Sequence, residues 1–107
     1  MKIVIYHNPR CSKSRQTLTL LLERGIDPET VKYLDTPPSH QELDSILRGL
    51  NMEPRQLMRT KEAEYKELGL DDDALTRNQL IEAMITHPKL IERPIVVAGD
   101  QVALGRP

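Results

Sequence analysis

The order of the first three predicted elements constrains the fold of this chain most. Residues 2–6 are mostly β-branched or aromatic and predict a strand that stops at His7-Asn8-Pro9. Leucines at helical spacing follow as far as Gly25, and a second strand is predicted over 30–34. A strand, a helix and a strand in this order favour a parallel pair of strands joined by a right-handed crossover.

The middle of the chain carries helix signals. A Ser-x-x-Glu capping box at 39–42 and a Thr-x-x-Gln box at 76–79 each introduce a helix, and the second helix ends at His87-Pro88. Between them, 54–68 predicts a less regular helical stretch. The apolar faces expected to pack in the core are Leu43, Ile46, Leu47 and Leu50, and then Leu80, Ile81, Met84 and Ile85.

The C-terminal part of the chain predicts a β-hairpin. Two short apolar runs, 95–98 and 101–104, flank the two-residue turn Gly99-Asp100. The hairpin adds antiparallel strands to the parallel pair, so we expect an α/β fold with a mixed sheet and a helical insertion at roughly 39–87. A chain of 107 residues fits one domain, 1–107.

Composition excludes several classes of protein. A formal net charge of −1 at pH 7 argues against a general nucleic-acid binder, and no apolar run approaches a transmembrane span. The apolar start is too short for the core of a signal peptide. A single cysteine cannot form an internal disulfide, so we expect a cytoplasmic location. We also expect no bound metal or cofactor and no association with membranes.

The single cysteine, Cys11, lies where the first strand turns into a helix. Cysteine reacts as the thiolate, which unpaired N–H groups at a helix N-terminus stabilise. Arg10, Lys13 and Arg15 bring positive charge, and His7 adds more when it is protonated. A lone cytosolic cysteine is commonly a small buried hydrophobe, but a Pro-x-Cys turn among basic residues is a poor place for an inert thiol.

Spacing excludes two neighbouring chemistries. A dithiol oxidoreductase needs a second cysteine three residues after the first, where this chain has Ser14. A low-molecular-weight phosphatase loop needs an arginine six positions after the cysteine, where this chain has Thr17. A monothiol that cannot resolve its own intermediate requires an external thiol, and glutathione is the leading candidate.

These residues resemble the active-site signature of the glutaredoxin-linked arsenate reductases, within the wider ArsC/Spx-like group. The version in this chain is most similar to the arsenate-reductase-like (YfgD-type) subgroup. The resemblance covers essentially the whole chain and keeps the family's order and spacing. Its motifs are 7–15 (HNPRCSKSR), Tyr33-Leu34, Pro37-Pro38, Leu57-Met58-Arg59, Tyr65, Leu68-Gly69-Leu70, His87-Pro88, 92–97 (ERPIVV) and Gly105-Arg106-Pro107.

The resemblance implies a thioredoxin-like fold and a two-thiol reduction of an oxyanion. Cys11 would attack arsenate to form a thiolate–arsenic adduct, glutathione would attack the adduct, and glutaredoxin would take the glutathione as arsenite leaves. His7 matches a residue that helps lower the pKa of the cysteine. Pro94 matches a cis-proline that faces the cysteine. Three arginines match the oxyanion ligands and three residues match the active-site loop: Arg59, Arg93 and Arg106, and Asn8, Ser14 and Arg15.

Two other functions remain open at this point. One is a glutathione-linked thiol oxidoreductase of protein mixed disulfides, for which arsenate is incidental. The other is an Spx-like regulator that binds RNA polymerase, although that group uses a two-cysteine switch and Ser14 occupies its second position here. Family members continue beyond the position of Pro107 into another helix. We therefore expect Arg106 to be held less firmly than Arg59 and Arg93.

Overall fold

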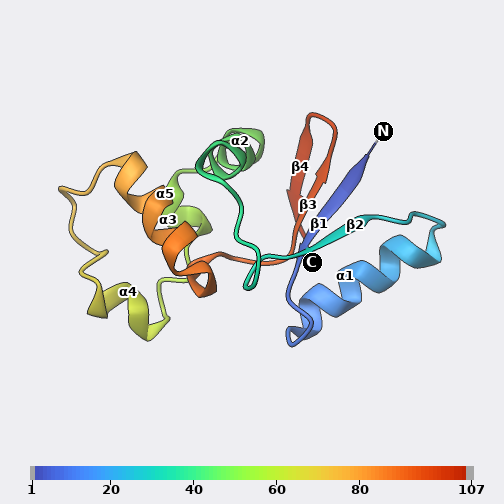
Figure 1. The fold of residues 1–107 in the computed structure, drawn as a ribbon, viewed down its shortest axis with the longest axis horizontal. Coiled ribbons are helices and arrows are strands. Elements are labelled where there is room, and N and C mark those ends of the chain that lie inside the picture. The colour runs from blue at the N-terminus through green and yellow to red at the C-terminus, as the bar shows by residue number, and fades with distance from the viewer. Residues whose placement is uncertain (1, 106–107) are drawn as a thin grey trace. The chain divides into compact units, whose positions relative to one another are not determined.

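In the computed structural model, which describes residues 2–105, the chain divides into two units. One comprises the residues up to Thr36 together with those from Arg93 onward, and the other comprises Pro37–Glu92. The sheet belongs to the first and the short helices to the second (Figure 1). The elements are β1 (Ile3–His7), α1 (Ser12–Glu23), β2 (Glu29–Lys32), α2 (His40–Leu50), α3 (Pro54–Leu57), α4 (Ala63–Glu67), α5 (Arg77–Thr86), the 3-10 helix η1 (Pro88–Leu90), β3 (Ile95–Ala98) and β4 (Gln101–Leu104).

The sheet has the strand order β2-β1-β3-β4. β1 pairs with β2 in parallel and with β3 antiparallel, while β3 and β4 form the predicted hairpin around Gly99, whose φ is +61°. Tyr6 near the end of β1 lies opposite Val31 of β2 and Ile95 of β3. The expected α/β fold with a mixed sheet is confirmed. The pairing brings the end of β1 beside the start of β3, although the two are far apart in sequence.

The second strand is shorter and earlier than predicted. β2 covers Glu29–Lys32, whereas the sequence predicted a strand over 30–34. Backbone N–H groups of Asp35 and Thr36 donate to the carbonyl of Lys32, so the chain turns immediately after the strand. Tyr33 is buried in this turn. Aromatic residues are typical of strands, which is why the sequence predicted the strand to continue through Tyr33.

Both predicted capping boxes are present in the helical unit. Ser39 caps α2 and Thr76 caps α5 by accepting the backbone N–H of the residue three positions later. In each box the side chain of that later residue, Glu42 or Gln79, accepts the backbone N–H of the capping residue. The buried faces are close to those expected, except that Leu50 and Ile85 are only half-buried. The core of this unit is formed by the fully buried side chains Leu43, Leu47, Leu57, Ile81, Met84, Leu90 and Ile91.

The stretch 54–68, which the sequence predicted as a less regular helical stretch, is helical only in part. It forms two short helices, α3 and α4, separated by a segment that pairs with residues near 91. Met58 forms an isolated antiparallel bridge with Ile91, and the N–H of Glu92 donates to the carbonyl of Leu57 at 2.8 Å. These long-range hydrogen bonds replace helical ones, so Arg59 lies between the two helices and its N–H donates to Leu90.

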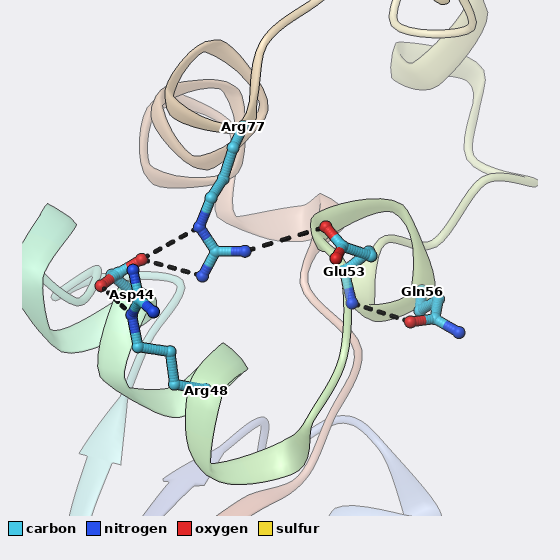
Figure 2. A network of polar contacts seen from close by, with 5 residues as sticks. All are labelled: Asp44, Arg48, Glu53, Gln56 and Arg77. Atoms are coloured by element: carbon cyan, nitrogen blue, oxygen red, sulfur yellow. Dashed lines mark hydrogen bonds and ion pairs between the residues drawn. The ribbon is translucent and has the colours of Figure 1, made fainter.

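Arg77 connects three elements of the helical unit (Figure 2). From α5, its Nε and Nη2 donate to Oδ1 of Asp44 in α2 at 3.1 and 2.8 Å. Its Nη1 lies 3.9 Å from a carboxylate oxygen of Glu53, the residue that precedes α3. Arg48 donates to the other oxygen of Asp44 at 2.9 Å. The two arginines hold the pKa of Asp44 below its ordinary value, chiefly by these hydrogen bonds.

None of the helices found between residues 2 and 105 has the length and apolar character needed to span a membrane.

Candidate active site

Cys11 is the residue that caps the N-terminus of α1. Its backbone is extended (φ −95°, ψ 123°), as is usual for a capping position, and its side chain is half-buried. Partial burial by itself raises the pKa of the thiol. The backbone N–H groups of Ser14 and Lys13, at the third and second positions of the helix, act in the opposite direction and lower the pKa.

Arg93 is the further group that stabilises the Cys11 thiolate. Its positive charge and a side-chain hydrogen bond both lower the pKa of Cys11, and the net pKa lies below that of an ordinary cysteine. The sequence pointed to the helix N–H groups and to the side-chain charges of Arg10, Lys13 and Arg15. Those side chains are exposed, and the lowering comes from helix N–H groups and Arg93.

The turn that leads into Cys11 is held by its own hydrogen bonds. The N–H of Cys11 donates to the carbonyl of Asn8 at 3.0 Å, and the side-chain oxygen of Asn8 accepts from the N–H of Arg10 at 3.0 Å. Arg15 extends back from α1 and donates to the carbonyl of Pro9 at 2.8 Å. Asn8 and Arg15, both expected in the active-site loop, therefore fix the backbone of the turn.

His7 and Ser14 lie buried behind this turn. Nδ1 of His7 is 2.6 Å from the hydroxyl oxygen of Ser14, and that oxygen also accepts the N–H of Asn8 at 3.0 Å. Burial, followed by the charges of Lys32 and Arg15, lowers the pKa of His7 below its ordinary value. The imidazole is therefore neutral at neutral pH, and the positive charge considered for a protonated His7 is not present there.

The peptide bond between Arg93 and Pro94 is cis, which is the geometry that the resemblance implied. Pro94 is buried, and its carbonyl accepts the N–H of Gly105 at 2.9 Å. Thr17 Oγ1 of α1 lies 3.3 Å from the carbonyl oxygen of Gly105 and 3.0 Å from that of Lys13, so its single proton is shared between two acceptors. A Cβ at Gly105 would lie 2.6 Å from both Pro94 Cγ and Thr17 Oγ1, so only glycine fits between them.

Thr17 and Gly105 are positioning residues that the sequence analysis did not identify. They join α1 to the loop that carries Arg93, although they lie 88 positions apart in the chain. The available signal was the glycine immediately before Arg106, because a close approach of two backbones is one of the reasons for which a chain requires glycine.

The other two arginines predicted to bind an oxyanion are Arg59 and Arg106. Arg59 belongs to the helical unit, where Nη2 lies 2.8 Å from Glu62 and Nε lies 3.8 Å from Glu92. Two carboxylates do not exhaust the five N–H donors of a guanidinium. Arg106 lies outside the described residues. The roles of Arg59 and Arg106 in binding an oxyanion stay predictions.

Metal ligands do not gather anywhere in the described part of the chain: residues 2–105 contain no group of three His, Cys, Asp or Glu side chains that could hold an ion. The chemistry available at this site is that of a thiolate beside helix N–H groups and a guanidinium. Such a site can attack an electrophilic centre and bind the oxygens of an anion.

Comparison with known proteins identifies relatives along the whole chain. A sequence model of the ArsC family matches residues 6–107. The uncharacterized protein YfgD of Escherichia coli K12 is 54% identical over 107 residues, which cover 99% of this chain and 90% of that protein. An arsenate reductase of Neisseria meningitidis serogroup A is also 54% identical, with 99% and 92% of the two chains covered.

Solved structures agree with the sequence relatives. The structure of an arsenate reductase from Vibrio cholerae has a TM-score of 0.96 and 55% identity, covering all of this chain and 92% of that one. The thioredoxin-like α/β fold implied by the resemblance is confirmed by this likeness.

Proposed function

The chain belongs to the ArsC family, and from that premise we propose that it is an arsenate reductase whose nucleophile is Cys11. The observation that carries the proposal is the environment of this thiol. Backbone N–H groups at the start of α1 and the Arg93 side chain both lower its pKa. The proposal is also supported by the 54% identity of this chain to an arsenate reductase of Neisseria meningitidis. A lowered pKa increases the fraction of the thiolate, which is the species that attacks arsenic.

The proposed reaction transfers two electrons from two thiols to arsenic. The Cys11 thiolate attacks As(V) and displaces one arsenate oxygen, which leaves as water after protonation. Glutathione then adds to the adduct and displaces a second oxygen as water. The thiolate of glutaredoxin attacks the glutathione sulfur, so a mixed disulfide forms, the As–S bond to glutathione breaks, and its electron pair reduces arsenic to As(III). Water hydrolyses the remaining bond between Cys11 and As(III), which releases arsenite and regenerates the Cys11 thiolate.

Arginines are proposed to hold the oxyanion during this reaction. Arg93 has the strongest support, because it already hydrogen-bonds to the Cys11 thiol and a bound arsenate would lie next to that sulfur. Arg59 and Arg106 are proposed as further ligands on the basis of the resemblance. A guanidinium pairs with two oxygens of a tetraoxyanion at once, whereas an ammonium contributes a point charge. Arg→Lys variants therefore test geometry separately from charge.

Glutathione and glutaredoxin are proposed as the reductants because the position that a resolving cysteine would take is Ser14. We place the reaction in the cytoplasm, where the thiol pool is kept reduced. With arsenate and no added thiol, the protein should stop at a Cys11 adduct that intact-mass measurement detects. Arsenite released over many turnovers without any added thiol would contradict this part of the proposal.

The test is arsenate-dependent consumption of NADPH in the presence of glutathione, glutaredoxin and glutathione reductase. Wild type should turn over, Cys11→Ser should not, and Arg93→Lys should lose activity while Arg24→Lys, an exposed change at the far end of α1, keeps it. Turnover of a glutathionylated protein substrate without any arsenate-dependent activity would instead identify a thiol oxidoreductase. Specific capture of the RNA polymerase α subunit, with no turnover, would identify a regulator.

A further inference from the structure

Ser14 occupies an unusual position in α1. Every residue of this helix is described, and Ser14 is its one buried residue, with no exposed surface. An amphipathic helix ordinarily places an apolar side chain at such a position. A buried hydroxyl is unfavourable unless its hydrogen bonds are satisfied, so the partners of Ser14 indicate what the residue does.

The hydroxyl of Ser14 joins three pieces of chain. Its oxygen accepts the N–H of Asn8 at 3.0 Å, so the hydroxyl proton is available for the second contact, 2.6 Å to Nδ1 of His7. A neutral imidazole accepts at one nitrogen and donates at the other, and the hydroxyl proton of Ser14 allows Nδ1 to be the acceptor here. The charged groups that act on His7, Lys32 and Arg15, lower the pKa of His7 and so favour this neutral ring.

The same residue reaches Cys11 through its backbone. The N–H of Ser14 is one of the two helix donors that lower the pKa of the thiol. The Asn8 residue held by the Ser14 hydroxyl accepts the N–H of Cys11 at 3.0 Å. The side chain of Ser14 thus holds Asn8, which accepts the N–H of Cys11, while the backbone N–H of Ser14 lowers the pKa of the thiol.

We propose that Ser14 is a positioning residue: its hydroxyl donates to His7, accepts from Asn8, and so holds the first-turn N–H groups of α1 against the Cys11 sulfur. His7 acts in this arrangement as a neutral acceptor that orients the hydroxyl. The proposal rests on Cys11 being the nucleophile of the proposed function, but not on arsenate being the substrate.

The test compares Ser14→Ala with Ser12→Ala. Ser12 is exposed, lies two residues earlier in the same turn and carries the same side chain, so Ser12→Ala is the matched control. Because the chain has a single cysteine, the rate of reaction with iodoacetamide against pH reports on Cys11 alone. We expect the midpoint for Ser14→Ala to rise by about 0.5–1 pH unit, which is the scale of one lost stabilising contact, and that for Ser12→Ala to stay at the wild-type value.

A second measurement uses the wild-type protein and does not depend on the variant folding. Nitrogen-15 NMR of the His7 ring should show a neutral ring at pH 7, with Nδ1 unprotonated and the proton on Nε2. A proton on Nδ1, or a folded Ser14→Ala protein whose Cys11 midpoint equals that of Ser12→Ala, overturns the proposal. Both readouts are independent of arsenate, so a failure of the arsenate assay alone would overturn the proposed substrate and not the role of Ser14.

Discussion

The helices of the two units begin in contrasting ways. In the helical unit, α2 and α5 each start with a capping box, in which Ser39 or Thr76 accepts the N–H of the third helical residue. In the sheet unit, α1 starts at Cys11, whose side chain makes no capping hydrogen bond, and the N–H groups at the second and third helical positions lower the pKa of its thiol. The same backbone donors therefore stabilise a helix in one unit and a thiolate in the other.

This difference extends to what holds each helix in place. The caps of α2 and α5 are local, since each uses residues three positions apart. The start of α1 combines local hydrogen bonds within residues 7–15 with contacts from distant parts of the chain: Thr17, in the second turn of the helix, lies 3.3 Å from the carbonyl oxygen of Gly105, and Arg93 lowers the pKa of Cys11. We conclude that α1, whose N-terminal donors serve a reactive group, uses tertiary contacts in addition to local ones.

The largest expected effect comes from Cys11→Ser, which replaces the thiol at the start of α1 by a hydroxyl that can cap the helix. Activity should fall by at least about 10³-fold, because the nucleophile is lost. Serine is a favoured capping residue, so the free energy of unfolding should stay level or rise by about 0.5–1 kcal/mol. Turnover in the coupled assay and urea unfolding measure the two effects, and a marked loss of stability would show that Cys11 is mainly a packing residue.

Gly105→Ala should weaken the tertiary support of α1. The added methyl group has no space between Pro94 and Thr17, so we expect a loss of about 1–3 kcal/mol, the usual cost of overpacking. Amide hydrogen exchange under native conditions should accelerate in α1 more than in α5. Equal acceleration in the two helices would mean that the start of α1 has no special dependence on this contact.

Removal of the local caps should have a smaller and purely structural effect. Ser39→Ala and Thr76→Ala should each reduce the free energy of unfolding by about 1 kcal/mol, measured by urea denaturation. The pH dependence of Cys11 alkylation should be unchanged in both variants, because neither residue belongs to the unit that contains the thiol. A shift of the alkylation midpoint in either variant would contradict the division of roles between the two kinds of helix start.

The same contrast explains what could be predicted from the sequence. A capping box is formed by residues within a stretch of four, so it can be recognised locally, and both boxes were predicted at the positions where they occur. The hairpin was predicted for the same reason, since its turn and strands are adjacent. The break in 54–68 was not, because it depends on the bridge between Met58 and Ile91, which no local pattern reveals.

The candidate site divides in the same way. Its proposed nucleophile, Cys11, and its loop were predicted from residues 7–15, which are contiguous. The cause of the low pKa of Cys11 was only partly predicted: the helix N–H groups were expected, but Arg93 was expected from the resemblance as an oxyanion ligand rather than as a partner of the thiol. The arginines nearest in sequence were misleading, since Arg15 extends toward Pro9 and Arg10 is exposed.

The pH dependence of Cys11 alkylation tests the central claim, that the N-terminus of α1 stabilises a thiolate. The rate should be measured for the folded protein and for the same chain unfolded in urea, which supplies the reference for a free thiol. A thiol whose pKa is lowered by folding is ionised at lower pH. The alkylation midpoint of the folded protein should therefore lie below that of the unfolded chain, which is about 8.5. A folded midpoint equal to or above the unfolded midpoint would contradict the account.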